Sequence, residues 1–401
     1  MERVKIKKRY KIIFKFLSLL LFCCLVFNIP VRAKGDLRKS AEEFALTNIT
    51  QIAKDMPNQG WSGNTKINDA ITTYDVDGNI NGYIFNLKTK GSESGYMQIF
   101  QSGDENYVIA YTFQGKHYFD KMMNAYKNKK KDKKVRDEYK LIYNGNNDFL
   151  IEDNTDETSI YYNLTTQQNL KQDKKELKKQ YKDIERNIVS NSKLSSDLTV
   201  VSNNLLASSS ASTTSTTGVT KYVVNANNAD LVECSDFTGK IVNGKTVDNH
   251  CSPTAGTNLV KYWAKRRGVS KLWYSSDFWV FSSLCVNMET IFSGDNAGTT
   301  SNNFLLGLKN YSTYTRGVSY SGYEWWGDGF TESCTFEKAK SYIDANIPFH
   351  LDLVGHSEVC FGYNTKNGAK QLIVNTGWDR YWTFQSFSSF EIDYYQYVRW
   401  N

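Results

Sequence analysis

The sequence predicts an α+β fold made of a small N-terminal α+β unit and a larger C-terminal domain. Two observations support this prediction. Apolar residues recur with helical spacing in some segments and with the alternation of strands in others, on both sides of residue 218. Composition changes at the same point, because eight of the nine tryptophans lie in residues 219–401, a length typical of one domain. We therefore divide the chain into residues 1–33, 34–124, 125–218 and 219–401.

Residues 1–33 have the pattern of a secretory signal peptide. A basic cluster precedes an apolar run from Ile12 to Phe27, and a small-residue cleavage pattern ends at Ala33. The apolar run is short for a membrane span and no stop-transfer pattern follows it, so we expect no stable membrane anchor. The sequence therefore predicts a secreted, extracellular protein from which these residues are removed.

Residues 34–124 combine one helix with several strands. The segment 37–56, LRKSAEEFALTNITQIAKDM, has the spacing of an amphipathic helix. Turn residues separate three segments with strand character, INGYIFNLKT, SGYMQIFQS and NYVIAYTFQG. This order predicts the small α+β unit.

Residues 125–218 are first charged and then polar. A lysine-rich run covers residues 127–140, and residues 170–187 have the pattern of a charged helix with a narrow apolar seam. Residues 205–220 have the composition of a flexible Ser/Thr-rich linker. The lysine run lacks interleaved aromatic residues and a recognition motif, so we favour a solvated helix face over a surface that binds nucleic acid.

Net charge follows the same division. The chain carries a formal net charge of +7, yet residues 219–401 hold 16 Lys+Arg against 17 Asp+Glu. The basic character therefore belongs to the first 218 residues, which we expect to be removed, and no nucleic-acid partner is predicted for the C-terminal domain.

Five cysteines remain after removal of the signal peptide. An odd number in an oxidising compartment leaves at least one thiol unpaired. The sequence leaves the pairing of Cys234, Cys285, Cys334 and Cys360 open. It contains neither Cys-x-x-Cys spacing nor a His-Glu-x-x-His motif, so it predicts no metal site, and no cofactor is implied.

The stretch DNHCSPTAGTNLVKYW, residues 248–263, places a cysteine where a helix begins. Pro253 suits the first turn of a helix, apolar residues follow at helical spacing, and Gly268 is a stop signal. Cys251 is therefore predicted at a helix N-terminus, where the helix dipole favours a thiolate and makes a nucleophile. The alternative, a small buried residue or half of a disulfide, stays open on this feature alone.

A thiolate nucleophile needs an imidazole partner and a third group that orients the imidazole. Strands are expected at residues 349–354, 358–363 and 371–375, and a polar turn joins the last two as a hairpin. His356 begins the second strand and Asn375 ends the third, so the two side chains can lie side by side. The Asn375 oxygen can then accept from one ring nitrogen while the other faces the thiol. The alternatives are a hydrogen-bonded core histidine and a plain turn asparagine.

Three segments, NHCSPTAGTNLVKYW, GHSEVCFGYN and VNTGWDRYW, are similar to the cysteine, histidine and asparagine boxes of papain-like cysteine peptidases. The similarity is greatest to streptopain-like and related secreted bacterial peptidases. The resemblance implies the papain-like fold, in which a central N-terminal helix packs on an antiparallel sheet. It also implies that Cys251 is the nucleophile, His356 the general acid/base and Asn375 the orienting residue, and that Trp378 shields the His–Asn pair. The part of the chain between the signal peptide and residue 219, called the leader below, resembles streptopain-type propeptides.

The sequence departs from the family pattern near the nucleophile. Lys245 stands where papain-like enzymes usually have the glutamine that donates to the oxyanion beside the cysteine's own N–H. Asn249 or Asn243 can take this role together with the backbone N–H of Cys251. The oxyanion site is therefore predicted to use Cys251 and Asn249, with the side-chain donor left open.

Two further differences concern the histidine and asparagine boxes. The turn that would read Asn-Trp-Gly-Trp-Gly in streptopain-like enzymes has Thr376 in place of the first tryptophan and Asp379 in place of the last glycine. Glu358 follows His356 by two residues, so regular alternation would put both side chains on one face of the strand. A carboxylate at that position is expected to raise the pKa of the imidazole.

The segments between the boxes carry less information. A capped helix is expected to begin near Ser301, and another helix is expected to end near residues 346–348. The segment 320–330, YSGYEWWGDGF, is aromatic and rich in glycine and predicts a loop. Its aromatic side chains either line a substrate groove or cover a core.

Together these features predict a secreted bacterial cysteine endopeptidase made as a zymogen, which hydrolyses peptide bonds through a Cys-His-Asn triad and a thioester acyl-enzyme. Its expected partners are protein or peptide substrates and its own propeptide, acting as an intramolecular inhibitor. Two alternatives remain. One is a peptidoglycan amidase or endopeptidase of the cell wall, and the other is a catalytically inactive papain-like protein that binds surfaces.

Overall fold

The computed structural model describes residues 34–130, 139–145, 148–153, 161–170, 173–194, 218–247, 250–292, 297–327 and 333–401. The chain divides into two compact units, Met1–Ser40 and Ala41–Asn401. The described part of the first unit is the beginning of one helix, and the second unit contains the remaining elements. In the described part of the chain, we find no helix that is long and apolar enough to cross a membrane.

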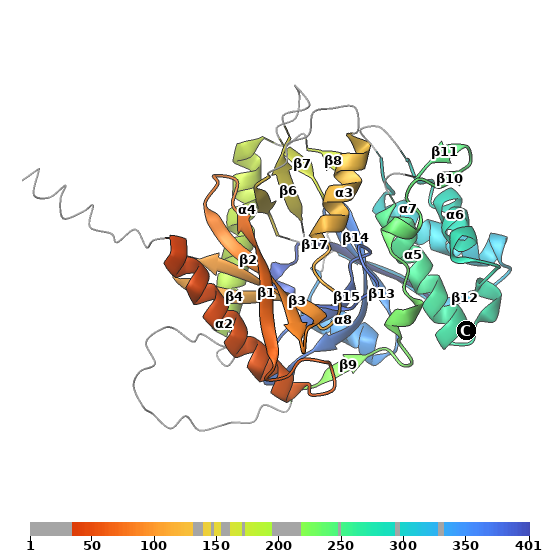
Figure 1. The fold of residues 1–401 in the computed structure, drawn as a ribbon. Helices are drawn as coiled ribbons and strands as arrows, with labels where there is room; N and C mark the ends of the chain where they lie inside the picture. The colour runs from red at the N-terminus through yellow and green to blue at the C-terminus, as the bar shows by residue number, and fades with distance from the viewer. Residues whose placement is uncertain are drawn as a thin grey trace, which may run out of the picture. The chain divides into compact units, whose positions relative to one another are not determined.

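Seven α-helices are present among the described residues (Figure 1). They are α2 (Lys34–Asp55), α3 (Phe119–Lys129), α4 (Lys174–Leu194), α5 (Cys251–Lys261), α6 (Asp277–Asn287), α7 (Ser301–Asn310) and α8 (Phe336–Asp344). The helices predicted from residues 37–56 and 170–187 and near Ser301 are confirmed as α2, α4 and α7. Thr300 caps α7 by accepting from the N–H of Asn303, the usual role of threonine before a helix.

Strands make up most of the remaining structure. Their bounds are β1 (Thr65–Tyr74), β2 (Ile80–Thr89), β3 (Ser92–Ser102), β4 (Glu105–Thr112), β5 (Leu141–Tyr143), β6 (Phe149–Glu152), β7 (Tyr161–Asn163), β8 (Gln168–Asn169), β9 (Thr220–Tyr222), β10 (Ile241–Val242), β11 (Lys245–Thr246), β12 (Tyr320–Gly327), β13 (Phe349–Leu353), β14 (His356–Asn364), β15 (Gln371–Asn375), β16 (Thr383–Ser386) and β17 (Ile392–Trp400). The predicted leader strands are confirmed as β2, β3 and β4, and the hairpin of the histidine and asparagine boxes as β14 and β15.

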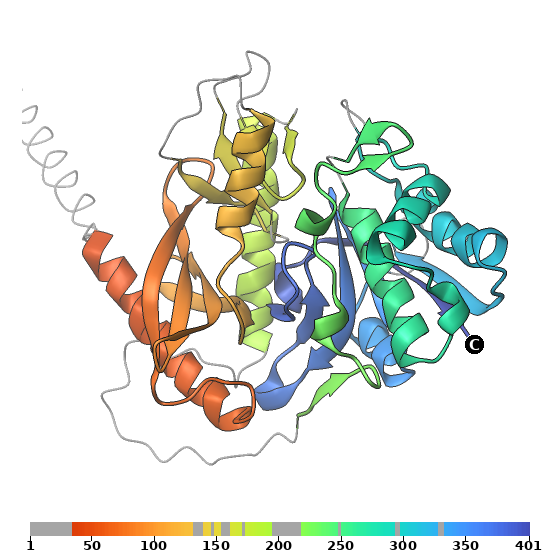
Figure 2. The same ribbon diagram turned by 45° about the vertical axis from the view of Figure 1, so that its right-hand side comes forward.

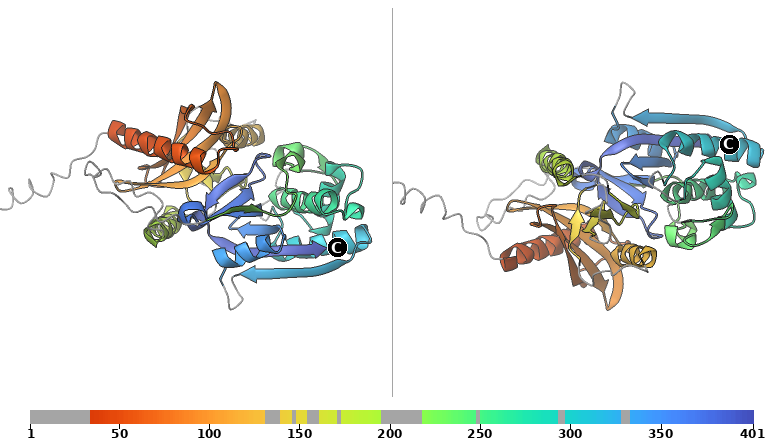
Figure 3. Two further views of the ribbon diagram at one scale, coloured as in Figure 1. Left: turned by 90° about the horizontal axis from the view of Figure 1, so that it is seen from below. Right: turned by 90° about the horizontal axis from the view of Figure 1, so that it is seen from above.

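Fifteen of the described strands join in one sheet, in which the ladders are antiparallel except for the pair β1 and β5. The strand order is β12-β17-β13-β14-β15-β16-β4-β3-β2-β1-β5-β6-β7-β8, with β9 beside β14. Helices α5, α6 and α7 gather side by side next to the C-terminal strands (Figure 3). Strand β12 is the edge strand of the sheet and pairs with β17. This mixed α+β architecture, with a large and mostly antiparallel sheet, is consistent with a papain-like peptidase domain.

One prediction about the C-terminal domain is wrong. The segment 320–330 was expected to be a loop, but its first eight residues form β12, which pairs with β17 from Tyr320 to Gly327. Aromatic side chains suit an edge strand, and the glycines that suggested a loop are accommodated there, Gly322 next to a register shift and Gly327 at the end of the strand.

The ladder between β4 and β16 joins the leader strands to the C-terminal strands (Figure 2). Phe384 pairs with Tyr111 in this ladder, and their rings stack with centroids 4.9 Å apart. One hydrophobic cluster therefore contains side chains of β2 to β4 together with Ile373 and Phe384. The leader is thus part of the same sheet and shares a core with the C-terminal strands.

Glycine at position 95 is needed for this sheet. Gly95 has φ +99°, and a Cβ atom there would lie 1.8 Å from the carbonyl oxygen of Thr112. Gly91 has a similar φ of +85° but no heavy atom within 4 Å of such a Cβ. We expect Gly91→Ala to lower the free energy of unfolding by about 1 kcal/mol through backbone strain alone, and Gly95→Ala by about 3 kcal/mol or more because a clash is added. Denaturant unfolding checks this, and equal losses in the two variants would contradict it.

Candidate active site

Helix α5 places Cys251 at its N-terminus, as the sequence predicted. The preceding residue, His250, has a non-helical backbone conformation, and its carbonyl accepts from the N–H of Thr254 in the first turn. The helix is buried along its whole length after Cys251, and it packs against β14 and α6. The position of the thiol is therefore fixed by the hydrophobic core that side chains between residues 223 and 400 form.

The Cys251 thiol lies beside two serines. Its Sγ is 3.9 Å from the hydroxyl of Ser252, and that hydroxyl is 2.8 Å from the hydroxyl of Ser357. Because Ser357 directly follows His356, this contact joins the cysteine and histidine boxes. Burial raises the pKa of the Cys251 thiol, while hydrogen bonds with Ser252 and Ser357 act in the opposite direction. We expected the helix terminus to lower this pKa, and in this structure the effect of burial is larger.

His356 is the first residue of β14, and it is 4% exposed. Its Nε2 lies 2.9 Å from the carbonyl oxygen of Thr376, and its Nδ1 is buried with no hydrogen-bond partner among the described residues. Since a carbonyl can only accept, Nε2 carries the proton of the neutral ring and Nδ1 keeps a lone pair. Burial lowers the pKa of His356 to about 4, although the Thr376 carbonyl raises it. The ring is therefore a neutral base with one free nitrogen.

Asn375 does not take the position that we predicted. It ends β15 as expected, but the strand register places it opposite Val359, three residues beyond His356. Its Oδ1 accepts a hydrogen bond from Asn258 at 2.9 Å, and its Nδ2 donates to the carbonyl of Asp379 at 2.8 Å. The side chain of Asn375 thus holds the turn after β15 and connects it to helix α5.

Two residues at the site were missed in the sequence. Thr376 was noted only as a departure from the family turn, yet its carbonyl contacts His356. Asn258 lies two turns after Cys251 on α5, is 1% exposed, and binds Asn375 as well as both backbone groups of Val232. A polar residue among the buried positions of a helix was the available signal, because buried amides require partners.

Glu358 lies on the same face of β14 as His356, as alternation predicted, but the expected rise in the pKa of the imidazole is not found, because burial lowers this pKa to about 4. Glu358 is fully buried, and its Oε1 is 3.9 Å from Nε2 of His356. A fully buried acidic side chain is rare, and its location beside the candidate base is the most unusual feature of this region.

Leader residues surround the end of β14 that carries His356. Trp378, which we expected to shield a His–Asn pair, is 7% exposed and packs in a hydrophobic cluster whose other buried members lie between residues 84 and 188. A Cβ built on Gly355 would lie 3.1 Å from a side-chain carbon of Thr166. The leader therefore contacts the turn that precedes the histidine and the tryptophan that follows the asparagine.

Further polar contacts connect the leader with the C-terminal domain. Lys121 on α3 forms an ion pair with Glu233 at 2.7 Å, and Gln168 donates to the carbonyl of Ala297 at 2.7 Å. Such partly exposed contacts contribute little free energy each, and they can separate without a large penalty.

The predicted oxyanion donor cannot be placed, because Asn249 lies outside the described residues. Lys245 is exposed on the short strand β11, and Asn243 lies in the preceding turn with φ +50°. The assignment of Cys251 and Asn249 to the oxyanion site stays a prediction.

The described residues contain five free cysteines, so the disulfides that the sequence left open are not formed in this structure. Cys234 is buried close to the site: its N–H donates to the carbonyl of Gly377 at 2.7 Å, and its own carbonyl lies 2.8 Å from Nε2 of His250. This backbone segment therefore connects the start of α5 with the turn after Asn375. Within the described ranges, no group of three or more acidic, histidine or cysteine side chains could hold a metal ion.

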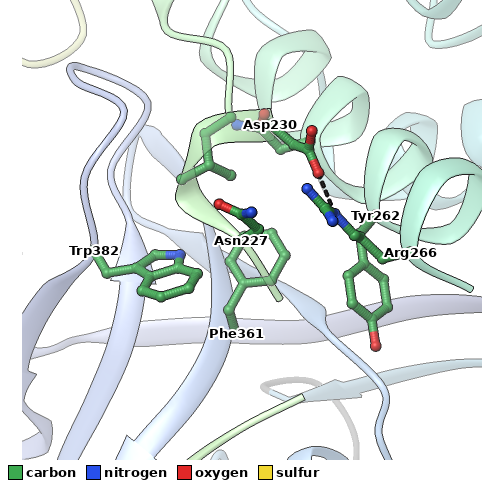
Figure 4. A pocket seen from close by; sticks show the side chains of 8 residues that line it. Asn227, Asp230, Tyr262, Arg266, Phe361 and Trp382 are labelled. Atoms are coloured by element: carbon green, nitrogen blue, oxygen red, sulfur yellow. Dashed lines mark hydrogen bonds and ion pairs between the residues drawn. The ribbon is translucent and has the colours of Figure 1, made fainter. Parts of the chain in front are cut away.

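A small pocket opens beside α5, and Cys251 is not among the residues that line it (Figure 4). It is lined by Asn227, Asp230, Leu231, Asn258, Tyr262, Arg266, Phe361 and Trp382. Arg266 and Asp230 pair with each other across it, so each satisfies the charge of the other. We assign no ligand to this pocket.

A thiol at the start of a buried helix, next to an antiparallel strand that begins with histidine, is the arrangement that the sequence predicted for a cysteine peptidase. Residues 237–400 match the model of a family described as Peptidase_C39 like family. The match contains all three predicted catalytic positions, and it supports a cysteine peptidase of the papain-like clan in this part of the chain. A comparison with curated proteins finds no match.

A buried carboxyl group in the turn after Asn375 is expected to make the stability of the folded protein depend on pH. Asp379 is 2% exposed, its Oδ1 accepts from the N–H of Tyr381, and its Oδ2 is buried with no hydrogen-bond partner among the described residues. Burial raises the pKa of Asp379 to about 7. The folded protein therefore binds a proton that the unfolded chain releases near pH 4, and stability falls as the pH rises through this window.

We expect Asp379→Asn to be more stable than the wild type by about 1–3 kcal/mol near pH 8, with a difference close to zero near pH 4. Urea unfolding at the two pH values measures this. Asp120→Asn, which alters an exposed ion pair with Lys116, serves as the control and should change little. A difference for Asp379→Asn that does not depend on pH would contradict the assignment.

Proposed function

We propose that the chain is a secreted cysteine endopeptidase made as an inactive precursor, with Cys251 as its nucleophile and His356 as its general acid/base. The observation that carries the proposal is the contact between the segments that contain Cys251 and His356. The N-terminus of α5 and the start of β14 are joined by the contact between Ser252 and Ser357, the neighbours of the two reacting residues. The family match over residues 237–400 supports the same reaction class.

The proposed reaction is acyl transfer to sulfur. Nδ1 of His356 takes the thiol proton, and the sulfur of Cys251 attacks the peptide carbonyl to form a tetrahedral oxyanion. The N–H of Cys251 and the side chain of Asn249 hold this oxyanion. His356 then gives its proton to the leaving amine, the C–N bond breaks, and a thioester remains. Water attacks the thioester while His356 accepts its proton, which releases the acid and restores the thiol.

The protonation of the two reacting groups supports an inactive precursor. A cysteine peptidase needs the thiolate, which an imidazolium stabilises. Burial raises the pKa of Cys251 and lowers that of His356 to about 4, so both groups are uncharged at neutral pH in the full chain. Thr166 lies next to Gly355, the residue before His356, and Trp378 packs among leader residues, which supports a contribution of the leader to this burial. Release of residues 34–218 would admit water and allow the ion pair to form.

The first test is maturation of the chain without its signal peptide, in mild reducing agent, for the wild type and Cys251→Ser. We expect the wild type alone to cleave itself between about residues 190 and 220 and then to digest casein, because both steps need the nucleophile. Mass spectrometry locates the cut. A leader-bearing protein as active as the cleaved one would exclude an inhibitory role for the leader.

The same assay tests the alternative functions. Activity on purified cell-wall fragments but not on casein would favour a peptidoglycan amidase or endopeptidase. If an externally trimmed protein is inert on both substrates, the catalytically inactive surface-binding protein is favoured.

A second test follows thiol reactivity during maturation. We expect iodoacetamide to label Cys251 at about pH 6 at least tenfold faster in the cleaved species than in the intact one, because the thiolate there is stabilised by an imidazolium that the intact chain does not form. Peptide mass spectrometry reads labelling in each species separately, and the buried Cys360 serves as an internal control. Equal labelling rates before and after cleavage would refute the electrostatic account of latency.

A further inference from the structure

None of the contacts of His356 described so far supplies a negative charge beside the ring. An imidazolium forms in each half of the proposed reaction, and a negative charge beside it would stabilise it. The Thr376 carbonyl fixes the tautomer of the ring but carries no net charge. Asn375, the expected orienting residue, is held by Asn258 and by the carbonyl of Asp379.

Glu358 is the group that can supply this charge. It lies two residues from His356 on the same face of β14, and its Oε1 is 3.9 Å from Nε2, the nitrogen that also faces Thr376. Its complete burial fixes the carboxyl group in that place. A buried acidic side chain that serves only packing is disfavoured, because an apolar residue of similar size would avoid the desolvation penalty.

We propose that Glu358 is a positioning residue for His356, which stabilises the imidazolium formed when the ring takes the Cys251 proton. This inference rests on the proposed peptidase activity and adds a residue to it. Glu358 contacts neither substrate nor sulfur in this role, and it acts only through the ring.

The leader bears directly on this pair. Glu358 interacts electrostatically with Tyr96 on β3, Tyr118 before α3, Tyr143 on β5 and Cys360 on its own strand, besides His356. Asp379 also interacts electrostatically with Tyr96 and Tyr118. Three of these groups belong to the leader and depart with it. Removal of the leader would therefore change the surroundings of Glu358, so the role of its charge is tested in the matured protein.

The test uses the full chain after self-maturation, with Glu358→Gln, Glu358→Asp and the wild type compared by the pH profile of kcat/KM. Glutamine keeps the shape of the side chain but removes its charge. Aspartate keeps the charge on a side chain that is shorter by one methylene group, farther from the ring of His356. We expect kcat to fall by about tenfold or more in Glu358→Gln with KM changed little, and the alkaline limb to move down by about one pH unit, with Glu358→Asp between. A merely structural role would lower activity without moving this limb.

Glu324→Gln is the matched control, because Glu324 pairs with Lys338 near the surface and its loss should leave the profile unchanged. An alkaline limb at the wild-type position in Glu358→Gln would overturn the proposal. If this variant does not fold, NMR titration of His356 in matured wild type and Glu358→Asp decides: a lower pKa in the aspartate variant supports the proposal, and an equal pKa overturns it. Wild-type protein without activity refutes the proposed function first, and Glu358 then has no catalytic partner to position.

Discussion

The antiparallel ladder between β4 and β16 is the constraint on which the site depends. On its other side β16 pairs with β15, the strand that ends at Asn375, so the leader sheet is in register with the hairpin that carries the asparagine and histidine boxes. Stacking of Tyr111 on Phe384 holds this register with large buried rings. Through this sheet, leader residues lie next to the turn before His356 and around Trp378.

Burial and the helix dipole have opposite effects on the pKa of the Cys251 thiol. A helix N-terminus stabilises an anion by about 0.3–1 kcal/mol at an ordinary surface site, whereas loss of solvation can shift the pKa of a buried group by several pH units. The dipole argument for Cys251 was correct in sign but too small to decide the outcome in this structure. The same desolvation keeps His356 neutral, so one physical cause acts on both groups and suppresses the ion pair from both sides.

The sequence predicted features that depend on local patterns and missed those that depend on register. Helix α5 and its cysteine followed from Pro253 and the apolar spacing, and β14 and β15 from their alternation, because these signals are contained in a few neighbouring residues. The predicted contact between His356 and Asn375 is absent because the register of the β14–β15 ladder, which places Asn375 opposite Val359, is a property of two strands together. Strand β12 was missed for a related reason, since its pairing with β17 outweighs its glycines.

In this structure a main-chain carbonyl, and not an asparagine side chain, contacts the ring of His356. This difference affects how the tautomer of the ring is fixed. An asparagine amide can present either its oxygen or its nitrogen to a ring, so its rotamer must be held by further partners. A backbone carbonyl offers an acceptor alone, and in this structure Thr376 fixes the tautomer that leaves Nδ1 of His356 free. Asn375 still serves the site, because its bonds to Asn258 and Asp379 hold the turn that aims the neighbouring carbonyl. Asn375 thus still shapes the surroundings of the histidine, while the atom that contacts the ring belongs to the next residue.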